Sequence, residues 1–555
     1  MSESVEIQIY DTTLRDGSQG DQITLSAKDK SRIAYKLDEF GVSFIEGGWP
    51  GSNPKDMHFF EMMKNAEFKN ARLVAFGSTR FANSSVEKDA GVQSLLESGV
   101  DTVTIFGKSW EIHASRILGV SLEENLSMIY ETIDFLKRKG LAVIYDAEHF
   151  FDGYIHNRAY CLKTLEAAMS AGSDVVVLCD TNGGTTPWDL ERIFKETAAD
   201  LEVPLGIHAH NDCGFALANT LAAVRCGASL VQGTINGYGE RCGNVDLVSV
   251  IGNLQAKLGY SCVPSESIRH LTELSRFVSE VANVAPLNQQ PFVGKSAFAH
   301  KGGIHVSAIQ KDPVAYEHLA PEIVGNRRRV LVSDLSGKSN ISYKARELDI
   351  KLGGNGFDSS RIVSEIKRLE EGGYQFDAAE GSLALLMKKV TGQFEEPFVL
   401  ESFRVTTEKN RSGPGSCHAT IKISVGEDQE ITAAEGDGPV NALDNALRKA
   451  LTKFYPEIEE MGLVDFKVRV IDGESGTASK VRVRIESRDP REIWSTIGVS
   501  ENVIEASWQA LVDSIQYKLS RERNGTKKPN STQIQEEETS AAHSRSAGFL
   551  RRALK

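Results

Sequence analysis

Short runs of β-branched and other apolar residues alternate with amphipathic stretches along the first part of the chain. The apolar runs predict strands at Ile7–Tyr10, Phe44–Gly48, Leu73–Gly77, Thr102–Phe106, Ala142–Tyr145, Val175–Cys179, Leu205–His208 and Leu230–Ile235. Apolar residues spaced three and four apart predict intervening helices, among them Lys30–Phe40, Leu122–Arg138 and Ala216–Cys226. Eight strand–helix repeats in about 250 residues are typical of a TIM (β/α)8 barrel. A doubly wound open sheet is the main alternative, but no GxGxxG motif follows the first strand.

The pattern changes twice beyond the predicted barrel, which we assign to residues 1–262. Residues 263–393 are mostly helical in pattern and polar, and predict a helical linker domain. Residues 394–520 predict an α+β domain, with strands at Cys417–Val425, Phe466–Val470 and Val481–Glu486 and helices at Val440–Phe454 and Glu501–Leu519. Residues 521–555 are rich in Ser, Thr, Glu, Lys and Asn and predict a disordered tail.

The α+β domain contains a short internal sequence repeat. Asn441-Ala442-Leu443-Asp444 recurs conservatively as Asn502-Val503-Ile504-Glu505, once in each predicted helix. This repetition predicts a tandem strand–helix duplication. Such an arrangement suits a regulatory domain that binds a small effector between two like halves.

Composition narrows the class of protein. The chain has 555 residues, too many for one hydrophobic core, and a formal net charge of −13, which argues against a nucleic-acid partner. The N-terminus lacks the basic and apolar regions of a secretory signal, and no stretch is long and apolar enough to span a membrane. The seven cysteines form no CxxC pair, which favours reduced thiols and a cytoplasmic location.

Polar clusters follow six of the eight predicted strands. They are Arg15-Asp16, Glu46–Gly51, Asp146–His149, Asp180–Gly184, His208–Asp212 and Asn236–Asn244. Because the carboxyl ends of barrel strands meet at one rim, and function in such barrels sits there, these clusters predict a single active site.

Two of these clusters predict a metal site. His208 and His210 are two residues apart on a strand, so their side chains point the same way, roughly 6.6 Å apart. With a carboxylate such as Asp16, two imidazoles can hold a divalent metal that keeps open positions for a substrate. Arg15 would add a positive charge beside it, which suits a small keto acid. A helix cap or surface ion pair is the structural alternative for Arg15 and Asp16.

Four motifs in order resemble those of the 2-isopropylmalate synthase, homocitrate synthase and citramalate synthase family. They are DTTLRDG (11–17), HAHND (208–212), NGYGERCGN (236–244) and HKGGIH (300–305), and the resemblance covers nearly the whole chain. Within the family, the stretch Ile45–Asp56 most resembles the citramalate synthase branch.

The resemblance assigns roles to individual residues. It makes Asp16, His208, His210 and Asn244 the metal ligands, Arg15 the contact to the keto oxygen, Thr181 the holder of the carboxylate, and Glu148 the catalytic glutamate. His305 matches a histidine of the linker region that in the family often comes from the partner subunit. Tyr316 lies at the spacing of a tyrosine that assists it, although Lys311-Asp312-Pro313 depart from the commoner sequence. The structural alternatives are a helix cap for Asn244, a βα turn around Thr181, and His300 in place of His305.

The resemblance also implies a reaction. Acetyl-CoA would condense with pyruvate in a Claisen-type step, and hydrolysis of the thioester would release (R)-citramalate and CoA for isoleucine synthesis. The implied cofactor is a divalent metal ion, with Mn²⁺ or Mg²⁺ favoured over Zn²⁺ or Co²⁺ because no thiolate is recruited. Further implied partners are an amino-acid effector such as isoleucine and a second copy of the chain in a homodimer.

Three alternatives to this reaction remain open at this stage. The substrate could be a larger 2-oxo acid, as in 2-isopropylmalate or homocitrate synthase, unless Trp49 and Phe106 face the substrate and leave room only for a methyl group. The chain could be an acyl-CoA lyase, although the 250 or so residues after the barrel argue against this. It could also be an amino-acid sensor with a decayed barrel, although every expected metal ligand is present.

Overall fold

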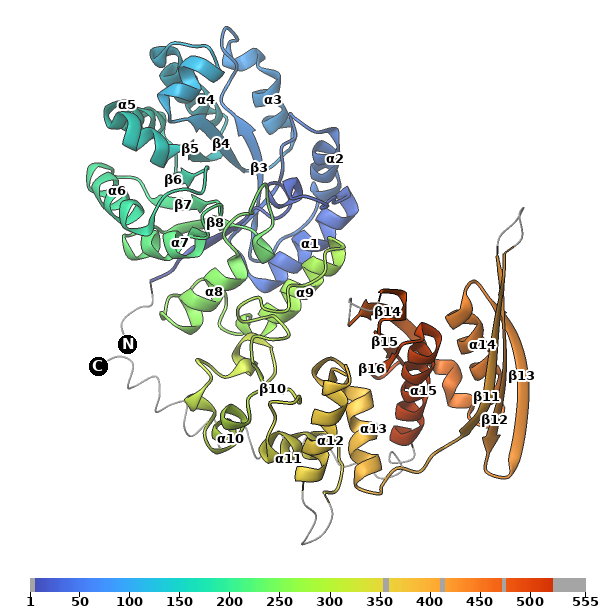
Figure 1. Cartoon of the computed structure of the whole chain (residues 1–555). Helices are drawn as coiled ribbons and strands as arrows, with labels where there is room; N and C mark the ends of the chain where they lie inside the picture. The colour runs from blue at the N-terminus through green and yellow to red at the C-terminus, as the bar shows by residue number, and fades with distance from the viewer. Residues whose placement is uncertain (1–4, 353–358, 410–414, 472–475, 523–555) are drawn as a thin grey trace. The chain divides into compact units, whose positions relative to one another are not determined.

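Eight parallel strands close into a barrel in the first part of the chain, as the sequence predicts (Figure 1). The structure is a computed structural model that describes residues 5–352, 359–409, 415–471 and 476–522. The barrel strands are β1 (Gln8–Asp11), β2 (Phe44–Gly48), β3 (Arg72–Ser78), β4 (Thr102–Lys108), β5 (Ala142–Glu148), β6 (Val175–Asp180), β7 (Leu205–Ala209) and β8 (Leu230–Gly233). Pairing of β1 with β8, with Gln8 opposite Leu230, closes the barrel and excludes the open-sheet alternative.

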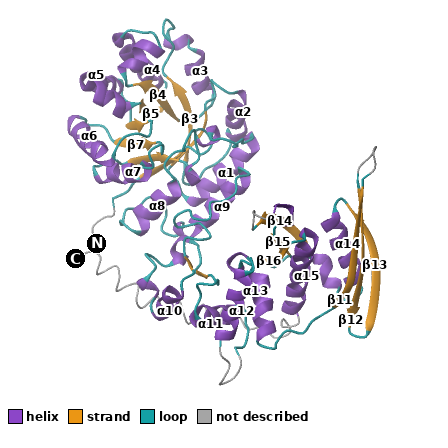
Figure 2. Ribbon diagram, viewed as in Figure 1, coloured by secondary structure: helices purple, strands orange, loops and turns teal. Residues whose placement is uncertain are grey.

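A helix follows each barrel strand and packs outside it (Figure 2). The helices are α1 (Ala27–Phe40), α2 (Pro54–Met63), α3 (Ala90–Glu97), α4 (Leu122–Arg138), α5 (Phe150–Ser170), α6 (Pro187–Asp200), α7 (Ala216–Arg225) and α8 (Leu247–Ala256). A large apolar cluster lies between helices and strands. A smaller one, with Tyr10, Phe44 and Ile144, fills the inside of the barrel. The interior is therefore packed, and only the rim is left for chemistry.

Local capping sets where these helices begin and end. The sequence pattern predicts the first helix from Lys30, but Ser26 and Asp29 form a capping box that starts α1 at Ala27. The helix ends at Gly41, which has φ 94°, a conformation that glycine adopts without strain. The apolar periodicity predicts where the helix lies, whereas the capping residues determine where it begins and ends.

The described residues divide into two compact units. The first comprises the chain up to Ala299 together with Glu317–Arg329, and includes α9 (Leu271–Val281). The second comprises His300–Tyr316 and the residues after Arg329. The short strands β9 (Ala299–His300) and β10 (Arg329–Val330) stand where the chain passes between units. The boundaries predicted after residues 262 and 393 stay predictions.

In the second unit a helical part comes first, and two three-stranded antiparallel sheets, each followed by a helix, make up the rest. Its helices are α10 (Gly303–Lys311), α11 (Lys338–Glu347), α12 (Ser360–Glu371), α13 (Glu380–Val390), α14 (Pro439–Leu451) and α15 (Val503–Glu522). Its sheet strands are β11 (Val399–Glu408), β12 (Ser416–Val425), β13 (Asp428–Gly436), β14 (Gly462–Val470), β15 (Val481–Arg488) and β16 (Ile493–Ser500). The sequence pattern missed β11, β13 and β16.

The two sheets with their helices are a tandem duplication, as predicted, but the register differs from that of the sequence repeat. Cys417 pairs with Gly436 in the first half, and Val481 pairs with Ser500 in the second, an interval of 64 residues at both positions. The predicted match of residue 441 with 502 implies 61 residues and is wrong by three. Residues three apart lie on the same face of a helix, so the apolar pattern alone cannot distinguish these two registers.

A matching hydrogen bond confirms this interval. Thr432 Oγ1 donates to the carbonyl of Ala446 at 2.8 Å, and Thr496 Oγ1 donates to the carbonyl of Ala510 at 2.7 Å. Each bond ties the last strand of a sheet to its helix, so the two halves share the same strand–helix packing.

Among the described residues, no helix combines the length and the apolar character needed to cross a lipid bilayer. The predicted tail starts at residue 521, but residues 521–522 end α15, and the rest of the predicted tail lies outside the described residues.

Candidate active site

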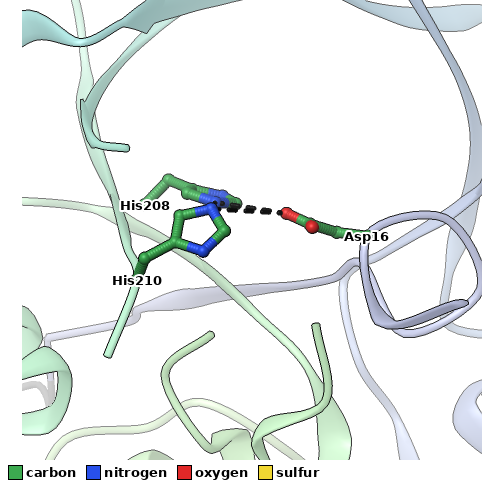
Figure 3. Close-up of side chains that lie close together, drawn as sticks. All are labelled: Asp16, His208 and His210. Atoms are coloured by element: carbon green, nitrogen blue, oxygen red, sulfur yellow. Dashed lines mark hydrogen bonds and ion pairs between the residues drawn. The ribbon is translucent and has the colours of Figure 1, made fainter. Parts of the chain in front are cut away.

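Asp16, His208 and His210 converge at the rim of the barrel (Figure 3). Asp16 follows β1, His208 lies in β7, and His210 comes directly after that strand. Oδ2 of Asp16 is 3.4 Å from Nε2 of His208 and 3.9 Å from Nε2 of His210, and the two Nε2 atoms are 3.3 Å apart. Ligand atoms bound to one ion at about 2.1 Å are separated by roughly 3 to 3.5 Å. The three buried side chains therefore have nearly the spacing that a shared metal ion needs.

The imidazole of His208 is oriented by a second layer of contacts. Gln232 on β8 donates from Nε2 to Oδ1 of Asp146 at 2.9 Å, which directs its Oε1 toward Nδ1 of His208 at 2.8 Å. Because this oxygen can only accept, Nδ1 of His208 carries the hydrogen. The lone pair is left on Nε2, which faces Asp16, as a metal ligand requires.

Asn244, the fourth predicted ligand, lies beside His210. It bridges to His210 in an isolated antiparallel pair, and only 2% of its surface is exposed. Its Nδ2 donates to the carbonyl of Tyr238 at 3.2 Å, while its Oδ1 is buried without a hydrogen-bond partner. A buried oxygen without a partner costs roughly 1 to 3 kcal/mol unless something binds it. This unpaired oxygen beside His210 fits a fourth ligand to the same ion.

The protonation states suit a cation. Burial by itself raises the pKa of Asp16, but the positive charge of Arg15 is the largest opposing effect, and the pKa is held well below its usual range. Burial, together with the charge of His208, lowers the pKa of His210 to about 4. Asp16 is therefore a carboxylate and His210 a neutral imidazole, the forms that bind metals.

Arg15 is fixed beside this cluster. Its Nε donates to Oε2 of Glu46 at 2.6 Å, and its guanidinium lies 3.8 Å from the ring centroid of Phe76. Tyr10 holds the other oxygen of Glu46 with a hydrogen bond of 2.8 Å. NH1 of Arg15 is 3.6 Å from Oδ2 of Asp16. The positive charge is therefore held rigidly next to the candidate metal ligands.

An aromatic cluster borders Arg15. Phe76 stacks on Phe106 with ring centroids 5.2 Å apart. Trp49 meets both rings edge-on, at 5.8 Å from Phe76 and 5.4 Å from Phe106. Since Arg15 lies over Phe76, these three rings form an apolar wall on one side of the rim.

Glu148 and Thr181 lie at neighbouring strand ends. Glu148 ends β5 and forms an ion pair with Lys108, which ends β4. Thr181 follows β6, and its Oγ1 accepts a hydrogen bond from the backbone N–H of His149 at 2.9 Å. Arg241, in the loop after β8, donates to the carbonyl of Thr181 at 2.8 Å. Both predicted residues are thus carried by the carboxyl ends of barrel strands.

His305 and Tyr316 belong to the second unit, where their rings stack with centroids 4.2 Å apart. His305 is exposed, and Tyr316 is 44% exposed. Their pairing accords with a joint role, and their part in the chemistry stays a prediction.

Sequence reasoning missed three residues that organise the site. Glu46 and Asp146 stood inside the polar clusters after strands, but no role was assigned to them. Gln232 is the one polar side chain in the otherwise apolar strand β8, which is completely buried. A lone polar residue in such a strand is the feature that could have pointed to it. Their functions depend on contacts across the barrel that local patterns do not encode.

A cavity of about 430 Å³ opens beside Asn244. Its lining combines the loop after β8, including Asn236 and Tyr238, with apolar residues such as Leu217, Pro286 and Leu287. It has the mixed character of a pocket for a small organic ligand.

Family models match three successive segments of the chain. The model described as HMGL-like matches residues 6–278, the one described as homocitrate synthase post-HMGL domain-like matches residues 292–373, and the LeuA allosteric (dimerisation) domain matches residues 377–519.

Several relatives match the chain over nearly its whole length. The (R)-citramalate synthase of Geobacter sulfurreducens is 53% identical over 94% of this chain and 99% of its own. That of Aquifex aeolicus is 52% identical over 93% of this chain and 98% of its own. The probable 2-isopropylmalate synthase of Methanopyrus kandleri is 32% identical over 93% of this chain and 99% of its own.

Proposed function

Because the chain belongs to the family of 2-isopropylmalate, homocitrate and citramalate synthases, we propose that it acts as a citramalate synthase. It condenses acetyl-CoA with pyruvate and hydrolyses the thioester, which gives (R)-citramalate and CoA. The observation that carries this proposal is the convergence of Asp16, His208 and His210 beside the fixed charge of Arg15. That arrangement suits a 2-oxo acid, whose carboxylate and carbonyl oxygens can bind one cation together.

The condensation has to make the keto carbon electrophilic. Asp16, His208, His210 and Asn244 would hold a divalent ion, which when bound would act as a Lewis acid toward the keto acid. The ligand set contains carboxylate, imidazole and amide groups and no thiolate, so we favour Mn²⁺ or Mg²⁺ over Zn²⁺ or Co²⁺. Arg15 stabilises negative charge that develops on the keto oxygen, a contribution of about 3 to 4 kcal/mol where such donors have been removed.

Other residues orient the substrate and move protons. Thr181 is proposed to hold the carboxylate of pyruvate. The acetyl methyl group must lose a proton, and hydrolysis of the thioester needs an activated water molecule. Glu148 and His305 are the candidates for these transfers, each worth about 10²- to 10⁴-fold, and Tyr316 would assist His305, on which it stacks.

The choice of pyruvate rests on the aromatic wall of Trp49, Phe76 and Phe106. A keto acid that contacts Arg15 directs its side chain near these rings, because Arg15 lies directly over Phe76. Three large rings leave less room than aliphatic side chains would, which favours a methyl group over an isopropyl group.

The second unit is proposed to regulate the enzyme. Its duplicated sheets support a site for an amino-acid effector such as isoleucine, the end product of the pathway that citramalate would feed. The match to an allosteric and dimerisation domain supports a homodimer. All seven cysteines are free, which supports a cytoplasmic location.

A thiol-release assay tests the proposal. Acetyl-CoA is supplied with pyruvate, 2-oxobutyrate, 2-oxoisovalerate or 2-oxoglutarate, with and without added Mn²⁺. We expect pyruvate to give the highest kcat/KM, and activity to need the added ion. A preference for 2-oxoisovalerate or 2-oxoglutarate would assign the enzyme to another branch of the family. Release of acetyl-CoA from citramalyl-CoA without condensation would assign it to the lyases.

A further inference from the structure

Lys30 and Asp56 form a buried ion pair behind the loop that carries Trp49. Lys30 lies on α1 and Asp56 in the first turn of α2, and they are 1% and 6% exposed. Nζ of Lys30 contacts Oδ1 of Asp56 and also donates to the carbonyl of Gly47 at 3.1 Å. A single buried cation thus joins α1, α2 and the end of β2.

Asp56 also holds the backbone of Trp49. Its second oxygen, Oδ2, accepts a hydrogen bond from the backbone N–H of Trp49 at 2.9 Å. The carbonyl of Trp49 accepts bonds from the backbone N–H groups of Ser52 and Asn53, at 3.1 and 3.2 Å. Both backbone polar groups of Trp49 are therefore held, one by a buried carboxylate and the other by a tight turn.

Gly48 makes room for the carboxylate. Its φ is 154°, and a β-carbon at this position would lie 2.5 Å from Cγ of Asp56. Only glycine lets Asp56 approach the backbone this closely. The contact between Asp56 and Trp49 thus depends on residue 48 as well as on Lys30.

The indole of Trp49 reaches from this anchored backbone to the aromatic wall. It meets Phe76 and Phe106 edge-on, and Phe76 carries the guanidinium of Arg15. Because both backbone polar groups of Trp49 are hydrogen-bonded, its backbone cannot shift away from the rings without breaking these contacts.

We propose that the Lys30–Asp56 pair is a positioning device for substrate specificity, which holds Trp49 as a rigid wall against 2-oxo acids larger than pyruvate. This inference rests on the proposed function and deepens it. Neither residue touches the substrate, so both act through Trp49. A buried pair of this kind costs desolvation and seldom stabilises a fold more than apolar residues would, which is consistent with a role in geometry.

The test uses Asp56→Asn. Lys30 contacts Oδ1 and the N–H of Trp49 donates to Oδ2, and a carboxamide replaces one of these two oxygens with an NH2 group that cannot accept. The measured quantity is kcat/KM for 2-oxobutyrate divided by kcat/KM for pyruvate. A loss of folded enzyme lowers both values equally and cancels in this ratio. We expect the ratio to rise about tenfold, the lower end of what one methylene group is worth in an apolar pocket.

Asp174→Asn is the matched control. Asp174 pairs with Lys137 at 2.7 Å and accepts the backbone N–H of Val143 at 2.7 Å, next to the start of β5 and away from the rim. The Asp174→Asn variant should keep the wild-type ratio of kcat/KM for 2-oxobutyrate to that for pyruvate. An unchanged ratio in Asp56→Asn would overturn the proposal.

The double variant Lys30→Met/Asp56→Leu covers the case in which Asp56→Asn does not fold. It leaves no unpaired buried charge and still removes the acceptor for Trp49, so its ratio should rise in the same direction. Failure of the proposed function would appear separately, as a wild-type enzyme that releases no thiol with pyruvate. Wild-type activity with unchanged ratios would sink the specificity inference alone.

Discussion

Arg15 and Glu46 form a partly buried ion pair in which Nε of Arg15 donates to Oε2 of Glu46 at 2.6 Å. Glu46 is completely buried, and Tyr10 holds its other oxygen. The guanidinium that faces the candidate metal ligands is therefore oriented by residues of β1 and β2. This relationship explains how an arginine on a long, flexible side chain can act as a preorganised electrostatic group.

Glu46→Gln should weaken catalysis without removing Arg15. The amide keeps the shape but loses the charge that anchors the guanidinium. We expect kcat/KM for pyruvate to fall about 10- to 100-fold, less than the roughly 10²- to 10³-fold loss typical of removing such a donor itself. Glu131→Gln is the control, because Arg80 donates to Glu131 with the same geometry, at 2.7 Å, outside the candidate site. Equal losses in both variants would argue against this role.

Gln232→Leu should weaken metal binding while leaving every direct ligand in place. The glutamine fixes the tautomer of His208, so its loss lets that imidazole rotate or place its hydrogen on Nε2. Mutations of such outer contacts typically cost 10- to 100-fold in metal affinity, and we expect a similar loss of Mn²⁺ affinity in calorimetry. Unchanged affinity would show that Gln232 is only a packing residue.

Asp11 should make stability depend on pH. Burial raises its pKa to about 7, although hydrogen bonds from Thr13 oppose the shift. The folded protein then binds a proton that the unfolded chain releases at lower pH, so the free energy of unfolding should fall as pH rises from about 4 to about 7. Asp11→Asn cannot ionise and should show a flatter decline in melting temperature over this range. Parallel declines in the two proteins would contradict the assignment.

The fold was largely predictable from sequence because apolar periodicity encodes both the strands and the helices of a barrel. All eight barrel strands are predicted by the pattern, and the sequence also groups Asp16, His208 and His210 in one site. Three strands of the second unit, β11, β13 and β16, are not predicted by the pattern. β11 and β13 expose most of their residues, and the pattern there is a mixture of polar and apolar positions.

What could not be predicted depends on contacts between distant residues. Gln232 contacts His208 and Asp146, which come from other strands. Asp56 on α2 accepts the backbone N–H of Trp49 and pairs with Lys30 on α1. The predicted register of the duplication was wrong for a related reason. Helical periodicity tolerates a shift of three residues, whereas strand pairing across the sheet does not.

Truncation after residue 393 should abolish inhibition by amino acids and leave part of the condensation activity. The deletion removes both duplicated halves, in which we place the effector site. It also uncovers α13, because Ser382 on that helix donates to Asp513 on α15 at 2.6 Å, so a lower melting temperature is expected as well. The measurement is thiol release with pyruvate at increasing isoleucine, compared with the full chain. Inhibition that survives the deletion would place the effector site elsewhere.

Binding of Mn²⁺ to the metal-free protein tests the central claim most directly. Equilibrium dialysis with electron paramagnetic resonance should find one ion per chain, and His208→Ala should lose this site together with thiol release. His270→Ala, which removes an exposed histidine that pairs with Glu273, should bind Mn²⁺ like the wild type. If His208→Ala binds Mn²⁺ as tightly as the wild type does, Asp16, His208 and His210 do not form the metal site, and the proposed chemistry is wrong.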